Sequence, residues 1–532
     1  MMKNLFRKWL ALLLAAMLLM TCTACAAAET KARSVTIAVT SAPSSLNPLL
    51  IDATEVMKYA LSLEFLPLVE LNRELEFVPQ LAESITTQDN LTFTIRLQEA
   101  AAWSDGVPVT SRDVLFTLLL LTSPEAGRAI LSQYLIVGTD DAGMLPSGAT
   151  EIEGVKLIDD KTLTVTVKWP TALYTFENNF GRYLFVLPEH VLGDIPRDQL
   201  LTHEWFRAPD VISGPFFITE ADLSHYVRYR ANENYFLGAP KLDYINLNVV
   251  TPAQLLAGLK TGEIDLVQQT MASVLLEDYE AIRALPGVTA VPGSPITNQS
   301  IFFNTRNVTD VRIRQALLCG IPRELILEEL VGGSGEVVDA FLCSASLYYS
   351  GELGVTAYDP EKAAELIAAA TADGANTSLV WYCDSSDATF VSAVELIAAL
   401  MEDMGLHIDI RTVDLDTLMA IAGEGGFDVM SVQYTLAPTD PYTDMVWLLS
   451  ADGWTRYANP ALDAHFTTTQ ESADAEAVRA AYLAINRAVV EDCPMISAYI
   501  ISTMGAVNDR LMNAIPDVYG TFVNVHEWDI AE

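Results

Sequence analysis

The side chains best suited to hold a small ligand are serines that follow a strand and aromatic rings near another strand. Ser41 and Ser44 come after the predicted strand at 34–39, where α/β sheets commonly present ligand contacts. As turn residues they are explained equally well without a ligand. Tyr434 and Trp447 could stack on a ligand, although aromatic residues near strands pack in cores more often. These four side chains are candidate ligand contacts.

The chain carries no motif of a familiar enzyme in a convincing setting. We find no GxSxG, HExxH, phosphate-binding glycine-rich loop or dinucleotide fingerprint. The histidines are scattered without the spacing of metal ligands, at His190, His203, His225, His407, His465 and His526. We therefore expect neither catalysis nor a cofactor or bound metal.

The charge balance excludes one class of partner. The chain has 69 acidic against 31 basic side chains and a formal net charge of −38 at pH 7. Nucleic acids and anionic membrane surfaces are polyanions, so neither is an expected partner. Acidity of this size predicts a solvated surface, with a cation-attracting cleft as the alternative.

The N-terminus predicts export. A short apolar core at 10–20 follows three basic residues, Lys3, Arg7 and Lys8. The core is too short to span a membrane and fits a secretory signal. Thr23-Ala24-Cys25 resembles the end of a bacterial lipobox, so we expect a signal peptide at 1–24, lipid attachment at Cys25 and a tether at 25–33. Cleavage before Cys22, or a plain signal cut near Ala28, are the alternatives.

Four cysteines remain beyond this region. Cys319, Cys343, Cys383 and Cys493 are widely spaced and form no CxxC group, which makes zinc an unlikely occupant. An exported chain could pair them, and buried free thiols are equally consistent with the sequence.

The pattern of strands and helices along the chain indicates an α/β protein. The most informative segment is 91–116, where apolar and polar residues first alternate as in a half-buried strand. A turn follows at Trp103–Gly106. Thr110, with Asp113 three residues later, then resembles a capping box at the start of an apolar helix, with Asp in place of the usual Glu or Gln. Other predicted elements are a helix from Pro252 to Gly262, a strand at 264–267 and a strand–helix–strand unit at 379–382, 394–404 and 407–413.

The order of strand, tryptophan turn, Pro108 and capped helix resembles the signature region of bacterial extracellular solute-binding proteins of family 5, the peptide/nickel-binding receptors of ABC importers. Other segments are similar to the family's motifs in the family's order. They are SGPF at 213–216, RANENYFLGAPKLD at 230–243, LAGLKTGEIDL at 256–266, FNT at 303–305, DVRIRQA at 310–316, Gly426-Phe427-Asp428, Asp440-Pro441 and Cys493-Pro494. Their fixed order over nearly the whole chain makes the resemblance specific.

The resemblance implies a bilobal, periplasmic-binding-protein-like α/β fold of class II type, with an extra domain inserted in the first lobe. Mapped onto this chain, lobe I comprises 34–60, 175–295 and 498–532. The inserted domain is 61–174 and lobe II is 296–497. Two crossing strands join the lobes.

The resemblance also implies a function. A peptide or peptide-like solute would be captured between lobes that close by hinge motion. The closed, lipid-anchored monomer would dock on an ABC permease at the outer face of the cytoplasmic membrane, or in the periplasm, and ATPase subunits would drive import. A nickel chelate, an opine or a sugar remain possible ligands. A peptide or pheromone sensor on the same fold and a secreted hydrolase are the alternative functions.

In peptide-binding relatives, an aspartate before an Asp-Pro pair holds the α-ammonium of the peptide. In the matching stretch at 433–441, Ala437 stands at that position and Asp440 belongs to the Asp-Pro pair. A buried ammonium needs an anionic or well-bonded partner, because unpaired burial is costly. Either Asp440 or another carboxylate substitutes, or the ligand has no free amino terminus.

Overall fold

The computed structural model describes residues 32–52, 54–126, 136–385, 387–436, 438–472 and 474–531. The predicted signal peptide and Cys25 lie outside the described residues, as does Ala437. No helix within the described ranges is both long enough and apolar enough to cross a bilayer.

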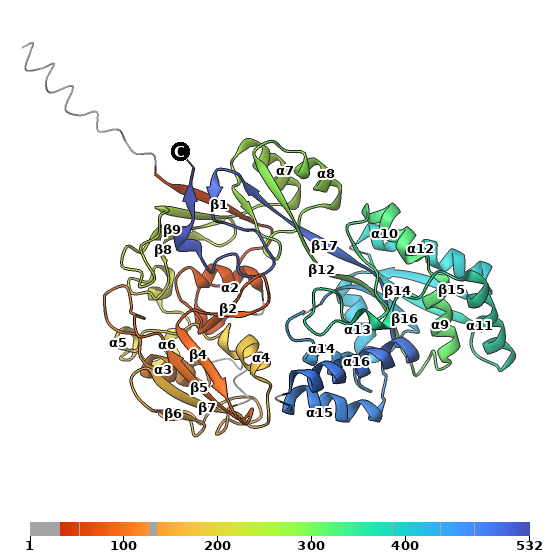
Figure 1. The fold of residues 1–532 in the computed structure, drawn as a ribbon, viewed down its shortest axis with the longest axis horizontal. Helices are drawn as coiled ribbons and strands as arrows, with labels where there is room; N and C mark the ends of the chain where they lie inside the picture. The colour runs from red at the N-terminus through yellow and green to blue at the C-terminus, as the bar shows by residue number, and fades with distance from the viewer. Residues whose placement is uncertain are drawn as a thin grey trace, which may run out of the picture.

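An 11-stranded sheet runs through the molecule and consists of two groups of strands joined by two long ones (Figure 1). The first group is β1 (Ser34–Val39), β8 (Phe216–Asp222), β9 (Tyr226–Ala231), β10 (Tyr244–Val249) and β11 (Leu266–Val267). The second group is β14 (Ser378–Asp384), β15 (His407–Val413) and β16 (Val429–Thr435). The antiparallel pair β12 (Val288–Phe303) and β17 (Met495–Asn508) lies between them, and β13 (Gly335–Glu336) pairs with β17.

The helices divide in the same way. The first half of the molecule contains α2 (Glu55–Ser62), α3 (Ser111–Leu121), α4 (Leu173–Phe176), the short helix η3 (Glu177–Gly181), α5 (Glu189–Leu192), α6 (Arg197–Leu200), α7 (Pro252–Thr261) and α8 (Tyr279–Arg283). The second half contains α9 (Val311–Gly320), α10 (Arg323–Val331), α11 (Pro360–Ala372), α12 (Ala388–Asp403), α13 (Leu415–Glu424), α14 (Tyr442–Leu448), α15 (Asp463–Glu471) and α16 (Ala475–Asp492).

The ribbon formed by β12 and β17 is irregular where it passes between the halves. The pairing register shifts around Pro292, Pro295 and Thr297. Proline supplies no N–H to a ladder, so such positions weaken regular pairing and bend a strand. The β12–β17 pairing shifts once more between Gln299 and Ser300. On its other side, β12 pairs with β16 over seven residue pairs, from Thr297↔Thr435 to Phe303↔Val429. The two halves are therefore connected at an irregular part of an otherwise continuous sheet.

A smaller four-stranded sheet belongs to the first half. Its order is β4 (Ala82–Thr87), β5 (Thr92–Leu97), β7 (Thr162–Thr166) and β6 (Val155–Leu157), and a separate hairpin is formed by β2 (Val69–Leu71) and β3 (Phe77–Pro79). The hydrophobic core beneath the small sheet extends from Leu49 to Tyr235, so the predicted inserted segment packs together with residues that follow it. A short pair near the C-terminus, β18 (Leu511–Met512) and β19 (Asp529–Ile530), completes the strands.

The strand, turn and capped helix predicted for 91–116 are confirmed. Phe93, Ile95 and Leu97 of β5 are buried, and Trp103 has no exposed surface. The carboxylate of Asp113 accepts hydrogen bonds from the backbone N–H of Thr110 at 2.8 Å and from its hydroxyl at 3.0 Å. The shorter aspartate therefore closes a capping box as Glu or Gln would.

Three other predicted elements differ in detail. The strand predicted at 264–267 is only Leu266–Val267, because the carboxylate of Asp265 is held by Arg510 at 2.6 Å and by the N–H of Thr36 at 2.9 Å. The helix predicted from Pro252 to Gly262 ends at Thr261, and Gly262 follows as its C-cap in the left-handed conformation. The helix predicted at 394–404 starts at Ala388, because Asp387 caps it by accepting the N–H of Phe390 at 2.9 Å.

Two hydrophobic cores cover opposite faces of the second half's sheet. Ile301 and Phe303 of β12 face the core that includes α9, α11 and α12, whereas Phe302 faces the core that includes α13 and α16. This alternation follows from the period of two in a strand. Four cysteines in the described part of the chain, Cys319, Cys343, Cys383 and Cys493, are buried and unpaired.

Candidate functional site

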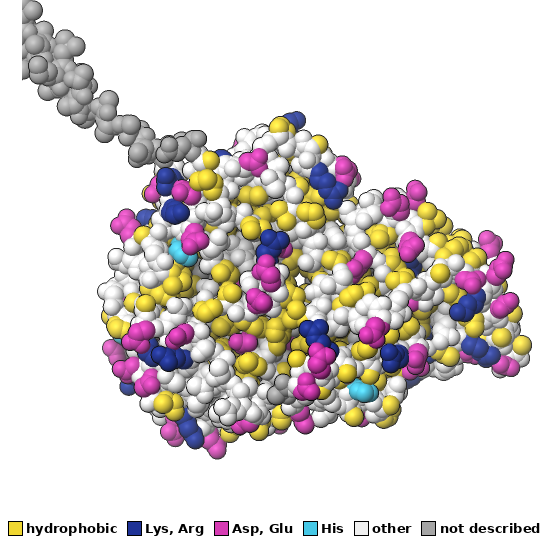
Figure 2. Space-filling view, in the orientation of Figure 1, with side chains coloured by type: hydrophobic (Ala, Val, Ile, Leu, Met, Phe, Trp, Pro, Cys, Tyr) yellow, Lys and Arg dark blue, Asp and Glu magenta, His cyan; other side chains and the backbone are white. Residues whose placement is uncertain are grey.

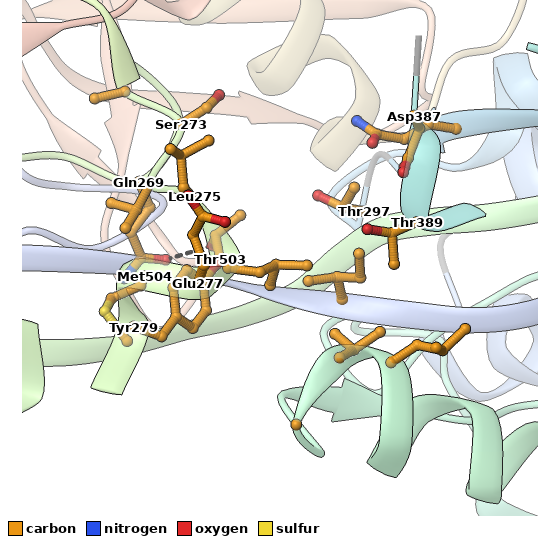
Figure 3. Close-up of a pocket in the computed structure, with 18 residues that line it drawn as sticks. Gln269, Ser273, Leu275, Glu277, Tyr279, Thr297, Asp387, Thr389, Thr503 and Met504 are labelled. Atoms are coloured by element: carbon orange, nitrogen blue, oxygen red, sulfur yellow. Dashed lines mark hydrogen bonds between the residues drawn. The ribbon is translucent and has the colours of Figure 1, made fainter. Parts of the chain in front are cut away.

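A cavity of about 610 Å³ lies between the two halves beside β12 and β17 (Figure 3). The wall from the first half contains Gln269, Ser273, Leu275, Glu277 and Tyr279, and the facing wall contains Thr297, Asp387 and Thr389. The first half also contributes Ala272, Val274 and Leu276. Residues of β17, the end of α10 and β16 complete the lining: Ile501, Thr503, Met504, Leu330, Val331, Gly332 and Gln433. Both halves therefore contribute to one space.

Strand pairing explains which side chains of the second half reach the cavity. Gln299 of β12 is paired with Gln433 of β16 and with Tyr499 of β17, and Thr297 is paired with Thr435. Directly paired residues point to the same face of a sheet, and so do residues two apart on one strand. Thr297, Gln299 and Gln433 therefore share the face that borders the cavity.

Asp387 lies at the N-terminus of α12, above this polar face. One carboxylate oxygen caps the helix through Phe390, and the other accepts the side-chain N–H of Gln299 at 3.0 Å. The same nitrogen of Gln299 lies 3.4 Å from the side-chain oxygen of Gln433. The helix cap and the glutamine together hold the aspartate at the cavity wall.

The cavity wall from the first half is held by hydrogen bonds to β17 and its neighbours. Gln269 donates to the carbonyl of Pro516 at 2.9 Å and accepts the hydroxyl of Thr503 at 2.9 Å. Tyr279 donates its hydroxyl to the carbonyl of Ser502 at 3.1 Å. These bonds fix the polar side chains of this wall.

Among the described residues that line the cavity, the charged ones are Glu277 and Asp387, and neither lysine, arginine nor histidine is present. Arg283 lies close behind the wall, 5.9 Å from the centroid of the Tyr279 ring, and forms an ion pair with Glu280. The described chain contains no cluster of three or more His, Cys, Asp and Glu side chains able to hold a metal ion. The cavity is an acidic and amide-rich binding space.

The aromatic candidates lie elsewhere. Tyr434 neighbours Gln433 in sequence and therefore points to the opposite face of the sheet, where its ring is 6.3 Å from that of Trp454. Burial, together with the charge of Asp444, raises the pKa of Tyr434. Trp447 packs edge-on against Trp454 at 4.8 Å and is 43% exposed. Neither ring lines the cavity.

Asp440 lies at a second contact between the halves. Asp440 is 7% exposed, and its carboxylate accepts a hydrogen bond from the side-chain N–H of Asn179 in η3 at 3.1 Å. Burial raises the pKa of Asp440 to about 6. Asn90 also reaches across, donating to the carbonyl of Glu471 at 3.5 Å. Side chains of the two halves touch directly at this contact, whereas the cavity leaves a space between the halves.

The two serines are near the first strand's end but outside the cavity lining. Ser41 is exposed, and Ser44 donates its hydroxyl to Asp52 at 2.6 Å. The residue before Ser41, Thr40, does contact the cavity wall, since its hydroxyl accepts the N–H of Ser273 at 2.9 Å. The end of the first strand therefore contacts the cavity wall, but the two predicted serines do not line the cavity.

Sequence reasoning missed the residues that do line the cavity, namely Gln269, Glu277, Asp387 and Gln433, and missed Gln299 beneath them. A signal existed for some of them. Gln299 lies between polar residues and the apolar run at 301–303, Gln433 directly follows Val432, and Asp387 stands immediately before an apolar helical run. Amides within buried strands need partners, which makes them informative even where aromatic residues stand beside them.

The chain is similar to known solute-binding proteins. Residues 76–456 match the model of the bacterial extracellular solute-binding proteins, family 5 Middle. Proteins of Brucella ovis and Brucella abortus, provisionally named ABC transporter peptide-binding proteins, are 30% identical over 374 residues, which is 68% of this chain and 65% of theirs. The chain thus matches less than two thirds of the length of these relatives.

Solved structures share the fold. The oligopeptide-binding protein AppA of Bacillus subtilis, solved with a nonapeptide, has a TM-score of 0.69 at 22% identity, covering 94% of this chain and 99% of that one. NikZ of Campylobacter jejuni, solved with Ni(L-His), has a TM-score of 0.71 at 20% identity, covering 93% and 99%. The predicted periplasmic-binding-protein-like α/β fold is confirmed.

Proposed function

Because the chain belongs to the family 5 bacterial extracellular solute-binding proteins, we propose that it is the receptor of an ABC importer and captures a peptide or peptide-like solute between its halves. The observation that carries this proposal is the cavity of about 610 Å³ to which both halves contribute. Pockets for small ligands commonly measure about 300–1,000 Å³. A short peptide fits a space of this size.

The lining supports a peptide-like solute. Amide and hydroxyl groups from Gln269, Gln433, Thr297 and Thr503 alternate with apolar side chains such as Ile501. Apolar surfaces with a few placed polar groups are the usual composition of a specific ligand pocket. Relatives named for peptide binding and for nickel binding both match this chain in sequence. The class of solute must therefore be inferred from the residues that line the cavity.

The proposal includes two lobes that move. Lobe I comprises 34–60, 175–295 and 498–532 with the domain inserted at 61–174, and lobe II comprises 296–497. Both proposed crossings fall within β12 and β17, and the register shifts near Pro295 supply an irregular point for a hinge. Closure would bury the solute, and the closed form would dock on the permease.

Attachment to the membrane is a further part of the proposal and rests on the sequence alone. The Thr23-Ala24-Cys25 segment would direct acylation of Cys25 after export. Labelling of cells with radioactive palmitate should mark the wild-type protein and leave Cys25→Ala unmarked. Equal labelling of both would refute this attachment site.

Native mass spectrometry of the freshly purified protein tests the receptor function. We expect a fraction of the molecules to carry one co-purified solute, which is released by unfolding in guanidinium. Adding the identified solute back should raise Tm and reduce the radius of gyration, as closure requires. Turnover of that solute into products, or a solute that binds without any compaction, would contradict the proposal.

A further inference from the structure

Among the described residues, the charged side chains that line the cavity are all acidic. Its two ionisable carboxylates, Glu277 and Asp387, come from opposite walls (Figure 3), and no basic residue lines it among those the structure describes. A peptide with both termini free carries one charge of each sign. This lining offers partners for the positive charge only.

The second observation is an unused hydrogen-bond acceptor beneath Asp387. Gln299 has no exposed surface, and its nitrogen donates to Asp387 and lies within reach of Gln433. Its oxygen has no hydrogen-bond partner among the described residues. A buried amide oxygen without a partner is costly. Because Gln299 lies beneath the lining, a ligand donor would reach this oxygen only after a shift of the cavity wall.

Asp387 itself retains acceptor capacity. A carboxylate offers about four lone-pair positions. Two hydrogen bonds to this one are described, one from the N–H of Phe390 and one from Gln299. Asp387 is only partly buried, so its remaining positions are open to a donor in the cavity.

The negative charge of Asp387 acts on buried neighbours. Burial raises the pKa of the Cys383 thiol to about 12, and the charges of Asp384, Asp387 and Glu395 add to the rise. Asp387 also raises the pKa of the buried Tyr499. The N-terminus of α12 offsets part of the charge on its cap, and a ligand cation would offset the rest.

We propose that Asp387 is the anionic anchor for a cationic group of the solute, an ammonium or guanidinium, and that the solute's carboxylate is not recognised by any charge. This inference rests on the proposed receptor function and names the solute class as short basic peptides. The side-chain oxygen of Gln433, which lines the cavity, accepts one of the cation's remaining N–H groups. Asp387 thereby replaces the carboxylate that is missing at Ala437.

Matched peptides test the charge requirement by isothermal titration calorimetry. The probes are alanyl-lysyl-alanine amide, the same peptide with a free carboxylate, and the amide acetylated on both amino groups. We expect the first two to bind with similar Kd values, because the carboxylate has no partner. Acetylation removes both cations and should weaken binding at least tenfold, the loss typical of a charge-assisted hydrogen bond.

Asp387→Asn tests the anchor. Asparagine caps helices as well as aspartate does, so folding is retained. Binding of the lysyl peptide amide should weaken at least tenfold in this variant, whereas the acetylated peptide should bind both proteins alike. Glu365→Gln is the matched control, since it removes one negative charge from an exposed position on α11 outside the cavity and should leave Kd unchanged.

The outcomes separate the two proposals. Equal affinity for lysyl and acetylated peptides, unchanged in Asp387→Asn, would overturn the anchor and leave the receptor function standing. If none of the peptides binds, the solute found by native mass spectrometry decides. A co-purified cationic solute that is lost in Asp387→Asn supports the anchor, and a neutral or anionic one overturns it. Absence of any bound solute would refute the receptor function itself.

Discussion

The two halves meet in two places that use the same chemistry differently. At the cavity, Asp387 is partly buried, held by one cap and one glutamine, and faces open space. At the second contact, Asp440 is nine-tenths buried and accepts Asn179 directly. One carboxylate is positioned for an external partner, and the other is already bonded across the interface. The difference supports the proposal that the solute is recognised at the first place, and it predicts that the second place affects closure.

The acidic side chains on the surface can be compared with these two carboxylates. Figure 2 shows acidic side chains scattered over the visible face of both halves rather than gathered at one spot. Exposed carboxylates of this kind are solvated and screened by salt, so most of the net charge of −38 contributes little to recognition. Position within a cavity, and not the total charge, makes Asp387 informative.

Blocking the cavity should produce the largest effect. Ser273 is exposed at the cavity wall, and the indole introduced by Ser273→Trp would occupy the space of the solute. We expect binding to weaken by about a hundredfold or more, with little change in Tm because the residue is not buried. Calorimetry with the identified solute measures the loss.

The matched control for this variant is Ser224→Trp, at the exposed turn between β8 and β9. It adds the same side chain away from both contacts and should bind normally. Unchanged affinity in Ser273→Trp would mean that the solute binds elsewhere.

Closure should depend on pH through Asp440. Burial raises its pKa from 3.8 to about 6, and the nearby charge of Asp444 adds to the rise, so the closed form holds the proton more tightly than an open form would. The contribution to closure is fully present below pH 3.8 and is lost as pH rises through about 6. We expect affinity to fall by about tenfold from pH 5 to pH 8.

Asp440→Asn removes this titration and should flatten the profile, while Asp416→Asn, an exposed position on α13, should keep the wild-type slope. Calorimetric titrations at four pH values suffice. The same slope in Asp440→Asn and wild type would show that the second contact does not control closure.

The smallest expected effect concerns the other carboxylate of the cavity. Glu277 is exposed, so water screens its attraction to a cation more than that of Asp387. We expect Glu277→Gln to weaken binding of a lysyl peptide by about threefold. A loss equal to that of Asp387→Asn would show that both walls hold the cation equally.

Much of the fold could be predicted because its signals are local. The alternation in β5, the cap formed by Thr110 and Asp113, and the exact placement of β1 and β15 depend on residues near one another in sequence. The family-like segments added the arrangement of these elements. The early start of α12 was missed because a cap at Asp387 was not considered.

The candidate site could be predicted only by region. Tyr434 and Gln433 are neighbours, yet they point to opposite faces of β16. Tyr434 was proposed from the sequence, whereas the adjacent Gln433 lines the cavity. Asp440 was predicted as a ligand contact, but it does not line the cavity and its carboxylate accepts a hydrogen bond from Asn179, 261 positions away in sequence. Its place at the contact between the halves is therefore a tertiary property. The cavity likewise exists only once both halves are placed.

Hydrogen–deuterium exchange on the protein as purified and after removal of its solute by unfolding and refolding tests the account most directly. We predict that the bound solute protects amides around Gln269–Tyr279, Thr297–Gln299 and Asp387–Phe390, which surround the cavity. Weaker protection should appear at the second contact as the halves close. Protection confined to the surroundings of Asn179 and Asp440, with none at the cavity, would contradict it.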